Sequence, residues 1–110
     1  MNYTPNITAE ELQEFADEEE LDVKVTNNYS GRGMHGTTCL GITGPEREIE
    51  QFKMTLGFHC GYCLGHGSRT RVNDALYELY EATNTGHRTD NMGHDLIAYW
   101  PGVKLAPSEN

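Results

Sequence analysis

The sequence predicts a small α+β domain with two layers, in which a three-stranded, mostly antiparallel sheet carries about three helices on one face in the order α-β-β-α-α-β. Three observations indicate this class. A helix-capping motif opens the chain, two later segments carry apolar residues at helical spacing, and three short stretches read as strands. With 110 residues, 36% of them hydrophobic and 12 of them glycine, the chain has enough apolar material for one modest core. We therefore expect a single domain over residues 1–110.

Each expected helix has its own local signals. Thr8 and Glu11 have the spacing of a capping box, which satisfies backbone N–H groups at a helix start. The second helix is expected in "TGPEREIEQFKMTLG", residues 43–57, where Pro45 suits the first turn and Gly57 marks the end. The third is expected to end near residue 86. The apolar faces are Ile7, Leu12, Phe15 and Ala16 in the first helix region, Ile49, Phe52 and Leu56 in the second, and Val72, Ala75, Leu76 and Leu79 in the third.

The expected strands are shorter and more weakly signalled. Leu21, Val23 and Val25 alternate with polar residues, as in a strand with one buried face. "TTCLGIT", residues 37–43, predicts a second strand, and "HDLIAYWP", residues 94–101, a third that stops at its proline. "TDNMG", residues 89–93, is predicted as a turn, and a tail from about residue 105 to 110 is expected to be mobile.

The charge of the chain limits its partners. The formal net charge is −9 and the sequence pI is about 4.8, which argues against direct nucleic-acid binding, since phosphates require a basic face. It also argues against contact with an anionic membrane, and no apolar run is long enough to span one. The amino-terminal residues lack the regions of a signal peptide, and the three cysteines form no disulfide pattern. We therefore expect a cytoplasmic protein.

"HCGYCLGHG", residues 59–67, is a candidate zinc site. His59, Cys60, Cys63 and His66 are zinc-ligand types, and a two-residue gap lets both sulfurs reach one ion. Cys39, His87 and His94 are further possible ligands from elsewhere in the chain. Two other interpretations stay open. The cysteines can be ordinary reduced thiols, or a redox pair, because "CGYC" resembles the active-site tetrapeptide of thioredoxin-fold disulfide isomerases; the following "LGHG" disfavours the helix those enzymes have there.

"YSGRGMHG", residues 29–36, is the candidate binding loop. Tyr29, Arg32, Met34 and His35 are residue types that often carry binding energy at protein interfaces. The same glycines could form a nest of backbone N–H groups around a small anionic ligand such as a phosphate or nucleotide, with Arg32 adding a charge. A plain hairpin loop rich in positive φ angles is the third interpretation, because the segment joins two strands and lacks the helix of a phosphate-binding motif.

The first helix is strongly acidic, with eight of the seventeen acidic residues between residues 10 and 22. A solvated helix face is the ordinary interpretation, and mimicry of DNA phosphates is the alternative. For catalysis, no spacing of the five histidines, the cysteines or the serines selects a nucleophile and base. We therefore assign no catalytic residue and expect a binding protein rather than an enzyme.

Two stretches together resemble a group of small, uncharacterised proteins encoded by bacteriophages: "YSGRGMHGTTCLGI", residues 29–42, and "DNMGHDLIAYWP", residues 90–101. The resemblance covers about a quarter of the chain and carries no activity or catalytic residue. It implies a protein that acts in the cytoplasm of an infected bacterium. The expectation is a non-enzymatic inhibitor or anti-defence protein that binds a host protein through Tyr29, Arg32, Met34 and His35, with the acidic helix adding electrostatic steering.

Overall fold

The computed structural model describes residues 4–31, 33–58, 71–84 and 87–107, and within them it shows three helices and one four-stranded antiparallel sheet. The elements follow the order α-β-β-α-α-β-β. They are α1 (Ala9–Glu18), β1 (Lys24–Tyr29), β2 (Cys39–Gly44), α2 (Glu46–Phe58), α3 (Arg71–Thr83), β3 (Arg88–Met92) and β4 (Asp95–Trp100). The predicted α+β class is confirmed, and the strand count is corrected from three to four.

The additional strand is β3, which covers most of the segment predicted as a turn. The turn itself is only Gly93 and His94, and it joins β3 to β4 in an antiparallel hairpin. Gly93 has φ 72°, a backbone conformation that glycine adopts without steric cost. The strand order in the sheet is β1-β2-β4-β3, so β1 and β3 form the two edges.

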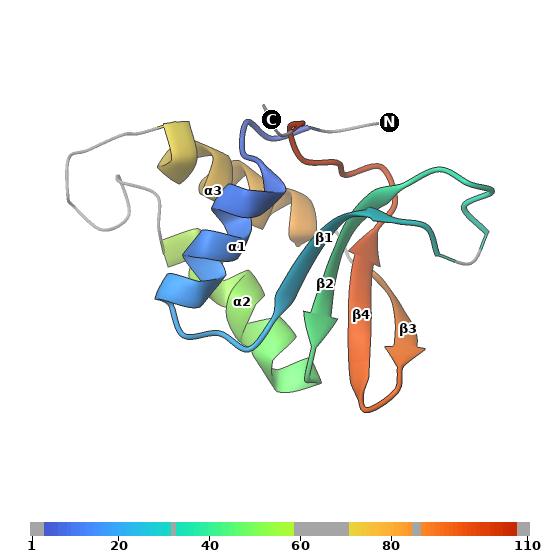
Figure 1. The fold of residues 1–110 in the computed structure, drawn as a ribbon. Helices are drawn as coiled ribbons and strands as arrows, with labels where there is room; N and C mark the ends of the chain where they lie inside the picture. Colours follow the sequence, from blue (N-terminus) through green and yellow to red (C-terminus); the bar gives the residue numbers. More distant parts are fainter. Residues whose placement is uncertain (1–3, 32, 59–70, 85–86, 108–110) are drawn as a thin grey trace.

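All three helices lie on one side of the sheet (Figure 1). The sheet residues that face them include Leu40, Ile42, Ala98 and Trp100, each at most 2% exposed. Trp100 also donates its indole N–H to the Thr83 carbonyl, 3.3 Å away, which satisfies its polar atom inside the core. The predicted apolar faces of the helices are confirmed, because Ile7, Leu12, Phe15, Ala16, Ile49, Phe52, Leu56, Ala75, Leu76 and Leu79 are buried and Val72 packs against them.

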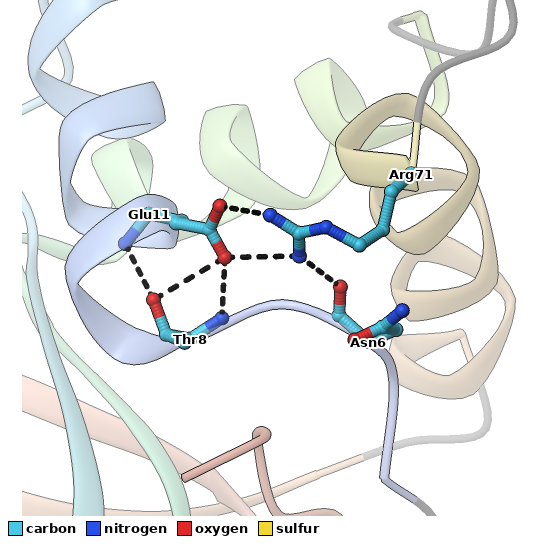
Figure 2. Close-up of polar contacts among 4 residues, drawn as sticks. All are labelled: Asn6, Thr8, Glu11 and Arg71. Carbon is cyan, nitrogen blue, oxygen red and sulfur yellow. Dashed lines mark hydrogen bonds and ion pairs between the residues drawn. The ribbon is translucent and has the colours of Figure 1, made fainter. Parts of the chain in front are cut away.

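The predicted capping box at the start of α1 is present. The Glu11 N–H donates to Thr8 Oγ1 (3.1 Å), and the Thr8 N–H donates to Glu11 Oε1 (3.1 Å). Arg71, the first residue of α3, extends this motif between helices (Figure 2). Its guanidinium pairs with both carboxylate oxygens of Glu11 and donates to the Asn6 carbonyl (2.7 Å). This contact ties the start of α3 to the start of α1.

The carboxyl-terminal segment is anchored at residues 105 and 106, so the predicted mobile tail does not begin there; residues 108–110 of that prediction lie outside the described residues. Leu105 is 1% exposed, and its N–H and C=O both bond to the Asn27 side chain, at 2.8 and 3.2 Å. The Ala106 N–H donates to the Ile7 carbonyl (2.9 Å). Asn27 and Ile7 supply these partners from distant parts of the chain. No helix of the described residues is long and apolar enough to cross a membrane.

Candidate binding surface

The connection between β1 and β2, residues 30–38, is here called the glycine loop. It contains two tight turns that share Met34: the Met34 N–H donates to the Gly31 carbonyl (3.2 Å), and the Thr37 N–H donates to the Met34 carbonyl (3.0 Å). Gly33 and Gly36 have φ 83° and 89°, which explains the glycines at these turn positions. His35 has φ 54°, an uncommon value for a residue with a side chain. The described residues of the loop, 30, 31 and 33–38, are therefore held by turn hydrogen bonds.

Met34 holds the loop by packing against the sheet face that no helix of the described residues covers, here called the open face. It is 7% exposed and lies with Cys39, Tyr99 and Tyr29 in a small second core. Its sulfur accepts the Gly31 N–H at 3.1 Å. The sequence predicted Met34 as a surface contact; it is instead buried, because the loop folds back over the open face and the thioether fills the space below. Met34 holds the loop in position for its exposed neighbours.

Tyr29 also lies on the open face. Its ring centroid is 5.0 Å from that of Tyr99, and its hydroxyl donates a short hydrogen bond to Asp90 of β3. This bond to a carboxylate, together with burial, raises the pKa of Tyr29 to about 12, so the phenol keeps its proton. A Cβ on Gly41 would lie 2.9 Å from Ile97 Cδ1 and 3.2 Å from Tyr29 Cβ, so a larger residue at this position would have to displace these side chains. Half-buried Tyr29 links the two edge strands and offers only part of its ring to a partner.

The exposed part of the glycine loop borders an open groove of about 440 Å³. One wall is the loop itself, and the other is the turn after β4, where the Val103 N–H donates to the Trp100 carbonyl (3.0 Å) and Gly102 has φ 95°. Lys104 crosses between the walls and donates to Thr38 Oγ1 (3.0 Å). The described residues that line it are Thr4, Met34, Gly36, Thr37, Thr38, Pro101, Gly102 and Lys104, and none of these carries a carboxylate.

The second wall of this groove is not predicted by the sequence. Pro101 and Gly102 form a tight turn that brings Lys104 back to the glycine loop, and the Leu40 N–H donates to the Val103 carbonyl (2.8 Å). The Pro-Gly pair is a turn signal in the sequence. The return of the chain from this turn to the glycine loop could not be predicted, because neither the buried Leu105 nor its partner Asn27 can be recognised from local pattern.

The other predicted site residues separate into two groups. His35 is exposed on the glycine loop, as a contact residue should be. Arg32 and the predicted zinc ligands His59, Cys60, Cys63 and His66 lie outside the described residues, so both predictions stay predictions. Among the residues that the structure describes, no three histidine, cysteine or acidic side chains gather in a way that could hold a metal ion.

Two of the further possible zinc ligands, Cys39 and His87, pack against other side chains of the fold. Cys39 is fully buried beneath Met34, and burial raises the pKa of its thiol, which disfavours the thiolate that binds metals. His87 lies beside Trp100, with ring centroids 5.1 Å apart, and its Nδ1 is 3.4 Å from the Lys53 ammonium. Burial, and then the charge of Lys53, lower the pKa of His87. Both side chains are engaged in the fold, whereas His94 is exposed in the β3–β4 turn.

Comparison of the chain with models of protein families, with curated proteins and with solved structures found no match.

Proposed function

We propose that this chain is a non-enzymatic protein-binding module that recognises its partner with the glycine loop and the adjoining groove. The observation that supports this most directly is the anchoring of the loop. Two turns and the buried Met34 side chain hold its backbone, while His35, Gly36 and Thr37 stay exposed at the rim of the groove. A loop that is already ordered loses little conformational entropy on binding, which favours affinity.

The groove gives this surface a place for an anchoring side chain. Binding energy at protein interfaces is concentrated where a side chain of one partner fills a pocket of the other. A groove of about 440 Å³ has room for such a side chain, and Thr37, Thr38 and Lys104 line it with hydrogen-bonding groups. The partner is expected to insert a polar or anionic side chain here, because the lining residues that the structure describes carry an ammonium and no carboxylate.

The nature of the partner is inferred from charge and resemblance. The likeness of residues 29–42 and 90–101 to small bacteriophage proteins favours a bacterial host protein, with the binding module acting as an inhibitor or anti-defence factor. The acidic helix α1 packs on the helical side of the sheet, opposite the glycine loop. We infer that its carboxylates act through the long-range field of a chain with net charge −9, speeding the approach of a basic partner rather than contacting it at the loop.

The test is affinity capture from bacterial lysate, followed by titration of each captured protein in purified form. His35→Gly removes the side chain and keeps the positive φ angle, and Arg32→Ala tests the other predicted contact. The matched control is His94→Gly, which removes an exposed histidine from the turn between β3 and β4. A partner bound by the wild type and by the control, and at least about tenfold more weakly by a loop variant, supports the proposal. Equal affinities for all variants contradict it.

A second candidate function is a module for a small anionic ligand, such as a phosphate or nucleotide, in the same groove. The observation that favours it is local charge: an acidic chain places a lysine and two threonine hydroxyls around a groove whose described lining residues include no carboxylate. Inorganic phosphate and a panel of nucleotides should then raise the melting temperature of the wild type, and Lys104→Gln should remove the rise. A flat response across the panel would exclude this candidate.

A further inference from the structure

The two edge strands of the sheet, β1 and β3, differ in how far other parts of the chain cover them. At the edge of β1, the Gln13 side chain of α1 accepts the Val25 N–H at 2.8 Å and donates to the Val23 carbonyl at 3.1 Å. Further along, Asn27 bonds both backbone groups of Leu105. Side-chain amides and the carboxyl-terminal segment therefore cover the β1 edge, which is how proteins prevent unwanted strand pairing.

The edge of β3 has no such cover in the described part of the chain. In a hairpin with a two-residue turn, the residues beside the turn form a hydrogen-bonded pair, here Met92 with Asp95. By alternation, the backbone groups of Asp90 and Arg88 then point to β4, and those of Thr89 and Asn91 point away from the sheet. Thr89 and Asn91 are exposed, and their backbone groups have no partner among the described residues. β3 is also the last element on its side of the molecule in Figure 1.

We propose that the β3 edge pairs antiparallel with the β3 edge of a second copy of this chain, with the twofold axis at Thr89. A twofold contact requires a surface that is complementary to itself. When two copies of β3 run antiparallel with the axis at Thr89, Arg88 of each copy lies opposite Asp90 of the other. Both pairs lie on the open face of the two sheets. Thr89 faces Thr89 and supplies the outward N–H and C=O groups, so the two four-stranded sheets become one continuous sheet.

The charges also favour this register over the neighbouring one, in which the strands are shifted so that the twofold axis lies at Asp90. With the axis at Asp90, the two Asp90 carboxylates would face each other as a close pair, which is destabilising. With the axis at Thr89, both close pairs join opposite charges. The two chains each carry a net charge of −9, so their overall repulsion opposes association at low salt. We therefore expect a weak dimer that forms at moderate ionic strength, where distant charges are screened. This proposal does not depend on the function of the glycine loop.

The experiment is analytical ultracentrifugation of the full chain in about 150 mM salt, where the Debye length is ~8 Å. The concentration is raised to ~0.5 mM, because small interfaces are weak. The wild type should show a reversible monomer–dimer equilibrium. Thr89→Pro removes the outward N–H but no bond to β4, and should raise the dissociation constant at least about tenfold. Gln51→Ala, an exposed change on α2, is the control that should leave it unchanged.

A charge exchange tests the register. Arg88→Glu sets two carboxylates opposite each other in the dimer, and Asp90→Lys sets two cations opposite each other, so each variant alone should be monomeric. An equimolar mixture restores both opposite-charge pairs and should form a heterodimer. Thermal melts show whether each variant is folded, and if Asp90→Lys is not, Arg88→Glu alone decides. A wild type that stays monomeric, a dimer unaffected by Thr89→Pro, or a dimer unaffected by Arg88→Glu would overturn the proposal.

Discussion

The contact between Glu11 and Arg71 makes a quantitative prediction about stability. The Arg71 guanidinium, followed by the Thr8 N–H, lowers the pKa of Glu11 from its ordinary 4.5 to about 2. One pKa unit corresponds to 1.36 kcal/mol, so the shift of a carboxylate fully protected from solvent would contribute roughly 3 kcal/mol to the free energy of unfolding. The Arg71 side chain is 48% exposed and that of Glu11 is 29% exposed, so solvent screens part of the interaction. We therefore expect the carboxylate to contribute about 1–2 kcal/mol to the free energy of unfolding.

The perturbation is Glu11→Gln, which removes the charge and keeps a side chain that can still bond to the Thr8 N–H. Urea unfolding at neutral pH should show a loss of about 1–2 kcal/mol relative to the wild type. Arg71→Gln should give a similar loss. The double variant should lose less than both changes added, with a coupling energy of roughly 1 kcal/mol. Glu18→Gln, an exposed change on the same helix, should stay within about 0.5 kcal/mol of the wild type.

The pH dependence follows from the direction of the shift. Because the pKa of Glu11 is lower in the folded than in the unfolded chain, its stabilisation is complete above pH 4.5 and is lost as the pH falls toward about 2. The difference between the wild type and Glu11→Gln should therefore shrink over this range. A difference of the same size at pH 3 and pH 7, or no loss at neutral pH, would refute the role assigned to this ion pair.

Three further predictions concern other parts of the fold. Gly31→Ala should lower the free energy of unfolding by about 1–3 kcal/mol in the urea assay, because its Cβ would lie 2.4 Å from the Tyr99 ring. The control Gly36→Ala would place its Cβ where nothing lies within 4 Å, so it should lose only the cost of its positive φ angle, about 1 kcal/mol. The pKa of His87 is lowered by burial and by Lys53, so stability should decline as the pH falls below 6.5, and His87→Gln should flatten melting temperature against pH there. Elemental analysis of protein purified without chelator decides between the zinc and free-thiol interpretations of residues 59–67: a zinc site predicts near-stoichiometric zinc that the double variant Cys60→Ser, Cys63→Ser lacks, and no metal in the wild type would leave both cysteines as free thiols.

The helices could be predicted because their signals are local. A capping box is visible in four residues of sequence, and the apolar spacing of α2 and α3 shows directly which face is buried. β3 could not be predicted in the same way, because Arg88, Thr89, Asp90 and Asn91 are all polar and show no alternation. It is a strand because the turn at Gly93 pairs it with β4.

The interpretation of residues 29–36 as a binding loop stays a prediction, whereas the exposure expected for Met34 is wrong, because its side chain is buried. The sequence shows that the glycines need positive φ angles, and a methionine among them looks like a contact residue. Its burial depends on the open face, where Cys39 and Tyr99 need a cover that no helix supplies. Lys104 was missed for a related reason, since only the folded chain brings it beside Thr38. Long-range packing decides both positions.

The central claim is that the glycine loop recognises another protein, and the most direct test is the affinity of a purified partner for His35→Gly and His94→Gly. The partner is first captured with the wild type from bacterial lysate, and the titration is then made by calorimetry. The proposal predicts that His35→Gly binds at least about tenfold more weakly than the wild type and that His94→Gly binds equally well. Equal affinity for both variants, with both fully folded, would contradict a recognition role for this loop.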